Sequence, residues 1–230
     1  MENDAAFRHE LKYLISRSDM DCCISRIEQF ARPDPHAASG RYFVRSLYFD
    51  DMYGSAYEDK ESGVASRRKY RIRIYDMDES FIRLEKKIKE GAFVRKESAP
   101  LSRAEYDMIL GGETDFLLKR SERAANDFAL EYRMNMLRPE VIVDYDRVPF
   151  VYEYGDVRIT FDMNVRSVFD ELDLFSEDAP SYEVLEPDRL VMEVKYTEFL
   201  PEVFRAILPG EGCRLAVSKY VLCDGLKRSV

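Results

Sequence analysis

The 230-residue sequence lacks any hydrophobic run long enough to cross a membrane. No stretch approaches the about 18 consecutive apolar residues that a spanning helix requires. The N-terminal residues, MENDAAFRHELKY, also lack the apolar segment of a secretory signal. We therefore expect a cytoplasmic protein without direct membrane insertion, so that any membrane partner would be a separate chain.

Cysteine and histidine are scarce, and their positions argue against a metal centre built from them. The four cysteines are Cys22, Cys23, Cys213 and Cys223. One adjacent pair and two distant single residues match neither the ligand spacing of a zinc site nor the disulfide framework of a small secreted protein. Because Cys22 and Cys23 fall in a predicted helix, we expect buried, reduced thiols. The two histidines are isolated, and neither is expected to be a ligand.

The sequence also lacks the common nucleotide-binding motifs and any excess of positive charge. It contains no Gly-Lys pair and no G-x-G-x-x-G pattern, which excludes a P-loop. Its 44 Asp and Glu residues outnumber 35 Lys and Arg residues, for a formal net charge of -9. Such an acidic chain is a poor candidate for binding nucleic acid or a membrane surface. Any anion site must therefore concentrate its cations locally.

The segment RRKYRIRIY, residues 67–75, concentrates cations in this way. Its basic residues are Arg67, Lys69, Arg71 and Arg73. Tyr70, Ile72 and Ile74 fall between them. In a β-strand, successive side chains point to opposite faces, so this segment would have one hydrophobic face and one positively charged face.

Strand-like segments recur along the chain with short connections. The expected strands cover residues 7–16, 41–51, 67–75, 81–89, 92–98 and 188–196, with two or three more within 139–162. The expected helices begin at Ser18, Asp51, Leu101, Glu122, Leu200 and Ala216. Glu90-Gly91 and Gly155-Asp156 are typical of tight turns between antiparallel strands. These features predict a single α+β domain over residues 1–230, with about eight antiparallel strands in a sheet or barrel.

Two of the expected helices have recognisable ends. Ser18 and Asp21 have the spacing of a capping box, which starts the first helix at Ser18. Ser102 is the expected N-cap of the helix within 101–118, which Gly111-Gly112 should interrupt.

Several strands share the pattern of one charged face and one hydrophobic face. The charged faces contain Arg8, Glu10 and Lys12; Arg83, Glu85, Lys87 and Lys89; Tyr145 and Arg147; Arg158, Thr160 and Asp162; and Glu193 and Lys195. A solvated sheet face would explain any one strand. Across five strands, however, the faces are rich in Arg and Lys although the whole chain is acidic. If they point inward, they form a basic tunnel whose buried charges require a polyanion as partner. Arginine would offer bidentate contacts to phosphate oxygens.

The carboxylates among these cations have two explanations. Glu10, Glu85 and Glu193 could balance the neighbouring positive charge. Alternatively, one or two of them could hold Mg²⁺ or Mn²⁺, which proteins bind through few carboxylates while substrate phosphates complete the coordination. Glu193 is the preferred candidate.

Eight short motifs occur in the order of a known family. They are RHELKY, SLYFDD, YRIRIY, LEKK, YDR, DVRITFD, MEVKY and SKY, between residue 7 and about residue 222. Together they resemble the VTC domain, the polyphosphate polymerase domain of the CYTH and triphosphate-tunnel superfamily. The resemblance implies an eight-stranded antiparallel β-barrel tunnel with flanking helices. It also implies binding of triphosphate or polyphosphate with Mn²⁺ or Mg²⁺, and transfer of the γ-phosphoryl group of ATP to a polyphosphate chain.

The resemblance also assigns roles to residues of this chain. Those implied for catalysis are Lys12, Arg71, Arg73, Lys87, Arg147 and Arg158, and those implied for other phosphate contacts are Tyr145, Lys195, Ser218 and Lys219. Glu193 would be the metal ligand. Lys69 and Arg45 have a suitable character to line the tunnel, with less support from the motifs.

Two departures from the family pattern keep other activities open. Triphosphatases of the superfamily carry an E-x-E-x-K pattern on the first strand, and here Arg8 replaces its first glutamate. This favours the polymerase branch over a triphosphatase or polyphosphatase. Eukaryotic polymerases have a lysine where this chain has Ala216, which leaves a non-catalytic polyphosphate-binding module as a further alternative.

Overall fold

In the computed structural model, the structure describes residues 7–210, 213–214 and 218–229. The strands are β1 (Arg8–Ser16), β2 (Arg32–Pro33), β3 (Tyr42–Asp50), β4 (Ser66–Tyr75), β5 (Ile82–Glu90), β6 (Phe93–Leu101), β7 (Arg138–Tyr152), β8 (Val157–Val168), β9 (Tyr182–Glu183) and β10 (Arg189–Tyr196). The helices are α1 (Arg17–Ile27), α2 (Ser55–Glu61), α3 (Arg103–Leu110), the 3-10 helix η1 (Asp115–Lys119), α4 (Arg123–Met134), α5 (Glu202–Arg205) and α6 (Lys219–Ser229). Within the described ranges, no helix is both long and apolar enough to span a membrane.

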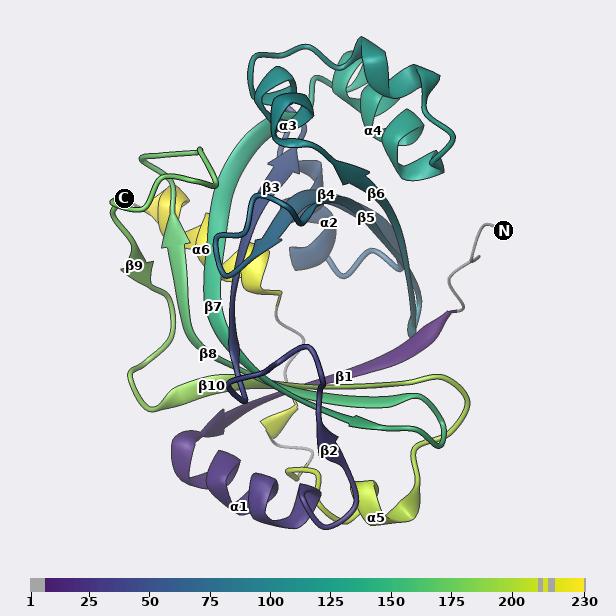
Figure 1. Ribbon diagram of the computed structural model, residues 1–230, viewed down its shortest axis with the longest axis vertical. Coiled ribbons are helices and arrows are strands. Elements are labelled where there is room, and N and C mark those ends of the chain that lie inside the picture. Colours follow the sequence, from purple (N-terminus) through teal and green to yellow (C-terminus); the bar gives the residue numbers. More distant parts are fainter. Residues whose placement is uncertain (1–6, 211–212, 215–217, 230) are drawn as a thin grey trace.

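The strands join into a closed ring, seen end-on in Figure 1. Neighbours pair in the order β7-β3-β4-β5-β6-β1-β10-β8, and a further pairing of β7 with β8 closes the circuit. The two-residue strands β2 and β9 extend the sheet beside β7 and β8. All pairings around the ring are antiparallel. This confirms the predicted α+β fold, in which eight antiparallel strands surround a tunnel and helices flank it.

The pairing between β1 and β6 is the shortest in the ring. These strands share only the register pairs Arg8↔Val94 and His9↔Phe93. On its other side, β1 pairs with β10 from His9 to Ser16. The first strand is therefore held chiefly by β10, and it diverges from β6 beyond its first two residues.

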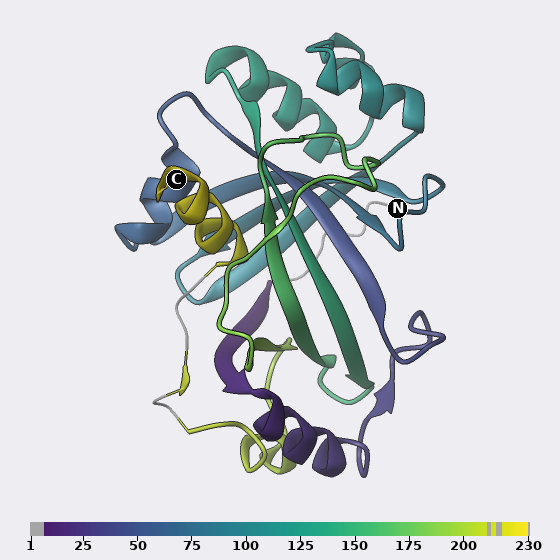
Figure 2. The same cartoon turned by 90° about the vertical axis from the view of Figure 1, so that its left-hand side faces the viewer.

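Helices cover the outside of the ring at opposite ends (Figures 1 and 2). Side chains from α3 and α4, including Tyr106 and Phe128, pack on β3 to β6 in one hydrophobic core. A second core joins α1 and α5 to β1, β8 and β10, with Ile27 and Phe204 fully buried. Helix α6 instead packs on the inward-facing side of the ring, where Tyr220 stacks on Tyr48 and clusters with Tyr145.

The two-residue period of the strands explains why the first two cores lie outside the ring. On β4, Ile72 and Ile74 are fully buried in the core shared with Phe128. Arg71 and Arg73 alternate with them and therefore point to the interior of the ring. The same sequence pattern thus places apolar side chains under the helices and cations inside the tunnel.

Two local expectations are corrected by the structure. The N-cap of α1 is Ser16 rather than Ser18, and its capping-box partner is Asp19. The same S-x-x-D spacing occurs twice, two residues apart, and the strand ends at the earlier serine. Cys22 is exposed although Cys23 is buried, because consecutive residues of a helix point about 100° apart.

The predicted ends of α3 and two predicted turns between strands agree with the structure. Ser102 caps α3 through a capping box with Glu105, and α3 ends before Gly111. The turns at Gly91 and at Gly155-Asp156 have positive φ angles, as tight connections between antiparallel strands require. The predicted C-terminal helix is α6, but residues 216 and 217 of that prediction lie outside the described residues.

Candidate functional site

Inside the ring, β4 contributes two arginines that are held by hydrogen bonds. The Arg71 guanidinium donates to the Glu85 carboxylate at 2.7 Å and to the Tyr48 hydroxyl at 2.7 Å. Arg73 donates to the Ser46 hydroxyl at 3.0 Å and to the Tyr145 hydroxyl at 3.1 Å. Glu85, Tyr48 and Ser46 lie on the strands next to β4, and Tyr145 lies one strand further on β7, so the register of the sheet fixes both guanidinium groups in the tunnel wall.

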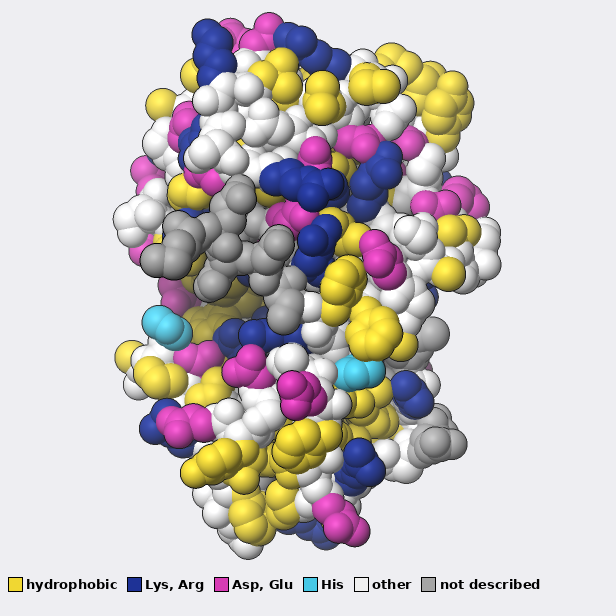
Figure 3. Space-filling model, turned by 90° about the vertical axis from the view of Figure 1, so that its right-hand side faces the viewer, with side chains coloured by type: hydrophobic (Ala, Val, Ile, Leu, Met, Phe, Trp, Pro, Cys, Tyr) yellow, Lys and Arg dark blue, Asp and Glu magenta, His cyan; other side chains and the backbone are white. Residues whose placement is uncertain are grey.

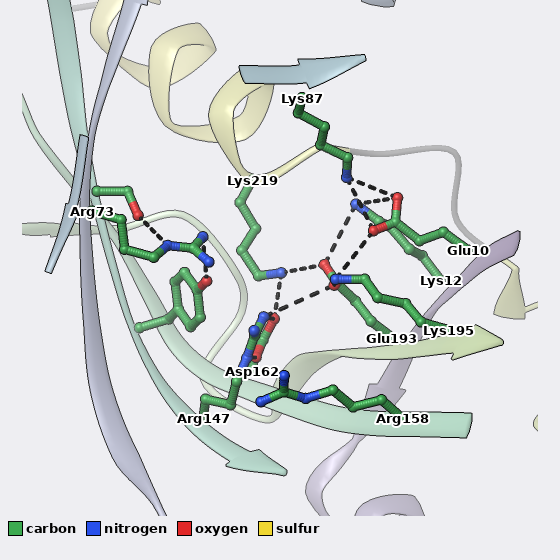
Figure 4. Close-up of polar contacts among 12 residues, drawn as sticks. Glu10, Lys12, Arg73, Lys87, Arg147, Arg158, Asp162, Glu193, Lys195 and Lys219 are labelled. Carbon is green, nitrogen blue, oxygen red and sulfur yellow. Dashed lines mark hydrogen bonds and ion pairs between the residues drawn. The ribbon is translucent and has the colours of Figure 1, made fainter. Parts of the chain in front are cut away.

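Glu193 lies at the centre of a cluster of cations (Figure 4). Lys219, at the start of α6, contacts Glu193 at 2.7 Å and Asp162 at 2.5 Å. Lys12 and Lys195 lie 3.4 Å and 3.3 Å from the Glu193 carboxylate oxygens. The carboxylate is therefore surrounded by lysines from β1, β10 and α6.

Arg147 completes this cluster from β7. Its guanidinium donates to both carboxylate oxygens of Asp162, at 2.6 Å and 2.8 Å. It also lies 3.9 Å from Glu193. Arg147 and Asp162 are register partners across β7 and β8, so this bidentate pair follows from the strand alignment.

A second carboxylate, Glu10, contacts three lysines. Lys87 on β5 donates to both of its oxygens, at 3.0 Å and 2.9 Å. Lys195 and Lys12 lie 3.5 Å and 3.7 Å away. Glu10 thus links β1 to β5 across the part of the ring where β1 and β6 diverge.

These side chains surround one cavity of about 70 Å³. Its lining consists of Lys12, Tyr48, Lys69, Arg71, Arg73, Lys87, Tyr145, Arg147, Glu193, Lys195, Ser218 and Lys219. Eight of these residues are Lys or Arg, and only one is a carboxylate. Figure 3, which shows the face at the right of Figure 1, has Lys and Arg side chains inside a hollow of the surface. The local charge is therefore opposite to that of the whole chain.

The structure brings together ten of the eleven predicted site residues, and Arg158 is the exception. Arg158 does not line the cavity. Its guanidinium donates instead to the Asp34 carboxylate at 2.7 Å and to the Tyr42 hydroxyl at 3.1 Å, and its side chain is 38% exposed. The strand parity was predicted correctly, since Arg158 pairs with Lys195 across β8 and β10. The alternation of residues along the strand did not indicate that Asp34, which follows β2, would bind Arg158.

The structure does not place Arg45 in the tunnel, although the residue type would suit it. Tyr48 does line the tunnel, and the sequence analysis did not single it out. Arg45 is buried away from the tunnel and makes a bidentate pair with Asp144. It shares a face of β3 with Leu47, in the outer core. Tyr48 lies on the other face, and its place in the SLYFDD motif was the only signal that could have found it.

Lys69 differs from the other lining cations. Within the described part of the chain, no carboxylate lies at ion-pair distance from it. Its amine is 3.4 Å from the Ser218 hydroxyl and 4.5 Å from the centre of the Tyr220 ring. Burial, together with the charges of Lys87 and Lys12, lowers the pKa of Lys69 to about 7.

Burial and neighbouring charges also shift the pKa values of Lys87 and Glu193. Burial lowers the pKa of Lys87 to about 7, with Glu10 opposing the shift and Lys12 adding to it. Burial alone would raise the pKa of Glu193, but Lys12 and the other surrounding cations hold it well below its ordinary value. The tunnel therefore combines permanently charged groups with two lysines that titrate near neutral pH.

The carboxylates fit a metal ion only if phosphate supplies most of its ligands. No group of three or more His, Cys, Asp or Glu side chains among the described residues is arranged to hold one. Glu193 is a single carboxylate, and both its oxygens face the tunnel cations. Mg²⁺ and Mn²⁺ are commonly held by one or two carboxylates together with substrate phosphates, and Glu193 fits that arrangement.

Comparison with known families places this tunnel in one of them. A family model described as the VTC domain matches residues 7–226. The chain belongs to the VTC domain family. None of the curated proteins compared with the sequence matches it. Ala216, where the sequence departs from eukaryotic members, lies outside the described residues.

Solved structures similar to this VTC domain share little of its sequence. The PH1012 protein of Pyrococcus horikoshii is 12% identical, with a TM-score of 0.51 over 94% of this chain and 98% of that chain. A conserved hypothetical protein of Pyrococcus furiosus is 11% identical, with a TM-score of 0.50 over 94% of this chain and 99% of that chain. HpAC1 of Hippeastrum, whose structure is described as revealing a dominant triphosphatase activity, is 13% identical, with a TM-score of 0.47 over 87% and 83%. At such identities, the two Pyrococcus structures show a shared fold alone.

Proposed function

We propose that this VTC domain transfers the γ-phosphoryl group of ATP to the end of a polyphosphate chain inside the tunnel. The observation that carries the proposal is the cavity lined by eight Lys and Arg side chains and a single carboxylate. The excess of cations over the carboxylates that contact them favours an anionic partner with many oxygens. The family match supports a polyphosphate-related substrate.

Phosphoryl transfer of this type needs little covalent chemistry from the protein. It requires in-line positioning and positive charge placed in advance where oxygens gain negative charge. Arg71, Arg73 and Arg147 would hold the β and γ phosphates of the donor, because their guanidinium groups are already fixed by neighbouring side chains. Lys12 and Lys87 would steady the transferred group or the acceptor end. No general base is needed, since the acceptor phosphate is already ionised.

The carboxylates around the cavity keep the cations in position. Glu10, Glu85 and Asp162 each contact two or more cations that line the tunnel. A phosphate chain would offer competing anionic oxygens to the same cations. Contacts between Lys87 and Glu10, or between Lys219 and Glu193, would then be exchanged for contacts to phosphate.

Glu193 would hold the divalent metal, Mn²⁺ or Mg²⁺. When bound, such an ion neutralises phosphate charge and helps to orient the donor. Lys12, Lys195 and Lys219 surround the same carboxylate. They would secure the phosphate oxygens next to it.

A triphosphatase would use the same cations with water as the acceptor. The first position of the E-x-E-x-K pattern is Arg8, whose side chain pairs with Asp156 at 3.2 Å, where both are well exposed. The chain therefore lacks the second carboxylate on β1 that this alternative would use.

One assay tests the proposal against its alternatives. The purified protein is given ATP, Mn²⁺ and a short polyphosphate primer. We expect longer polyphosphate with release of ADP. Release of orthophosphate without chain growth would show a hydrolase, and retention of the primer without turnover would show a binding module.

The variant Arg73→Ala tests the role of the tunnel cations in the same assay. Because Arg73 is buried and fixed by Ser46 and Tyr145, removal of its guanidinium should lower the rate of chain growth by about 10²-fold or more. Circular dichroism should show an unchanged fold. Unchanged turnover in this variant would remove Arg73 from the site.

A further inference from the structure

The helix that supplies Lys219 to the tunnel is fastened to a ring strand by a buried hydrogen bond. The Tyr220 hydroxyl donates to the Asp50 carboxylate at 2.5 Å, and the two residues are 1% and 2% exposed. Burial and the charge of Asp50 raise the pKa of Tyr220, so its hydroxyl keeps its proton and acts as the donor. Asp50 is the last residue of β3, and Tyr220 follows Lys219 directly in α6. The contact therefore fixes α6 beside its tunnel lysine.

Three backbone amides hold the Asp50 carboxylate in place. One of its oxygens accepts from the amides of Asp51 and Ala56, at 2.9 Å and 2.8 Å. The other accepts from the amide of Tyr57 at 3.1 Å. Helix α2 begins here, and because its N-cap makes no side-chain hydrogen bond, Asp50 satisfies amides of its first turn. These bonds fix both oxygens, so the carboxylate offers Tyr220 an acceptor with a defined direction.

The Tyr220 ring supports side chains that line the tunnel, although Tyr220 itself does not line it. Its ring stacks on that of Tyr48, with the centroids 5.1 Å apart, and the Lys69 amine lies 4.5 Å from its centre. The neighbouring Lys219 reaches from α6 to Glu193 (Figure 4). Tyr220 can therefore act on bound phosphate only through these lining residues.

The later turns of α6 are held by contacts of their own. The Ser167 hydroxyl donates to the backbone carbonyl of Cys223 at 3.0 Å, and Lys227 pairs with Glu140 at 2.6 Å. The Cys223 side chain is fully buried in the cluster beneath α6. Loss of the Tyr220 hydroxyl should therefore leave the helix folded and seated, while its first turn becomes free to move.

We infer that Asp50 and Tyr220 are positioning residues, which hold Lys219 and Lys69 where these lysines bind phosphate. The inference rests on the proposed function, because it concerns cations that the proposal assigns to phosphate. It also gives a role to two distant motifs, since Asp50 belongs to SLYFDD and Tyr220 to SKY. A first turn that is fixed in advance spares the cost of ordering its lysine when the substrate binds.

The test measures tripolyphosphate affinity by titration calorimetry on the whole protein. Tyr220→Phe removes only the hydroxyl and keeps the ring beside Lys69. We expect it to weaken binding about tenfold in the unmodified background. In a Lys219→Met background, where the lysine that it positions is already gone, the same change should weaken binding by no more than about threefold. A purely structural role would give equal losses in the two backgrounds, as long as both variants are folded.

A second variant and a matched control make the test sharper. Asp50→Asn alters the acceptor instead of the donor, so it should weaken binding to a similar extent, and its combination with Tyr220→Phe should add less than about threefold. Tyr106→Phe is the control, because the buried Tyr106 hydroxyl also donates to a carboxylate, that of Asp173 at 3.1 Å, but in the outer core. It should lower the Tm and leave the affinity within about twofold.

The outcomes distinguish this inference from the proposed function. If the unmodified protein does not bind tripolyphosphate, both are rejected. If it binds and Tyr220→Phe binds equally well, the inference alone is overturned. Equal losses with and without Lys219 would show that Tyr220 does not act through this lysine, which also overturns it. The same loss of affinity in Tyr106→Phe would have that effect too, because any missing buried hydroxyl would then weaken the tunnel.

Discussion

At the scale of single residues, the tunnel contains two lysines whose charge can change near neutral pH. Lys69 and Lys87 are half-buried among other cations, and loss of hydration together with those charges lowers the pKa of each to about 7. At pH 8 both are therefore largely neutral, and at pH 6 both are largely protonated. A phosphate chain beside them would favour the ammonium form and raise both pKa values.

Binding of tripolyphosphate should therefore take up protons at alkaline pH. The lysines should contribute uptake of about one proton or more at pH 8 and close to none at pH 6, because they are already charged at the lower pH; protons released by the phosphate chain itself are subtracted from this number. Calorimetric titrations in buffers of different ionisation enthalpy measure this number directly. Lys69→Arg keeps the charge but removes one titrating group, so its uptake at pH 8 should be smaller. Equal uptake at both pH values in the unmodified protein would contradict the assignment.

Arg158 is the predicted site residue that does not line the cavity, and its role can be tested directly. The family resemblance gives it a catalytic role, but its guanidinium is partly exposed and engaged by Asp34 and Tyr42. We expect Arg158→Ala to reduce the rate of chain growth by less than about tenfold, compared with about 10²-fold or more for Arg73→Ala. Parallel assays at saturating primer measure the ratio. A loss as large as that of Arg73→Ala would show that Arg158 turns into the tunnel when substrate binds.

At the scale of elements, β4 separates the tunnel from the outer core. Ile72 has no exposed surface and packs beneath α4. Replacing Ile72 with alanine should lower the free energy of unfolding by about 2–5 kcal/mol, because it leaves a cavity in a closely packed core. Urea denaturation measures this loss. The affinity for tripolyphosphate should stay within about twofold under conditions where the variant is folded, because Ile72 does not face the tunnel. A selective loss of affinity without a loss of stability would contradict the division of the strand into two faces.

The same strands show how far the sequence alone can predict the site. From Lys69 to Ile74 on β4, cations and apolar residues alternate strictly, and the predicted faces agree with the structure. On β3, both faces are largely buried, so alternation could not tell that Arg45 faces the outer core while Tyr48 faces the tunnel. Ser16 and Ser18 offered the same capping pattern, and the extent of the pairing between β1 and β10 decides between them.

Contacts between distant segments were beyond prediction for a different reason. Asp34 follows a two-residue strand with no pattern of its own, yet it receives the guanidinium of Arg158. The pairing of Lys87 with Glu10 depends on where β5 passes β1 around the closed ring. Such contacts depend on register and curvature, which a single sequence does not specify.

At the scale of the whole molecule, the tunnel cations come from elements all around the ring. They lie on β1, β4, β5, β7, β10 and α6. Their mutual repulsion acts between parts of the chain that must stay together. A phosphate chain would neutralise this repulsion and connect the same elements, so its binding should stabilise the complete ring rather than one segment.

Tripolyphosphate should therefore raise the thermal stability of the protein substantially. A ligand at 100 times its Kd stabilises the folded state by about 2.7 kcal/mol, which corresponds to several degrees in Tm for a chain of this length. Differential scanning fluorimetry with increasing tripolyphosphate measures the shift, and added salt should diminish it by screening the charges. Lys219→Met, which removes the contact of α6 with Glu193 and Asp162, should reduce both the affinity and the shift. A normal shift in this variant would mean that α6 takes no part in holding phosphate. No shift in the unmodified protein would mean that the eight cations do not form an anion site.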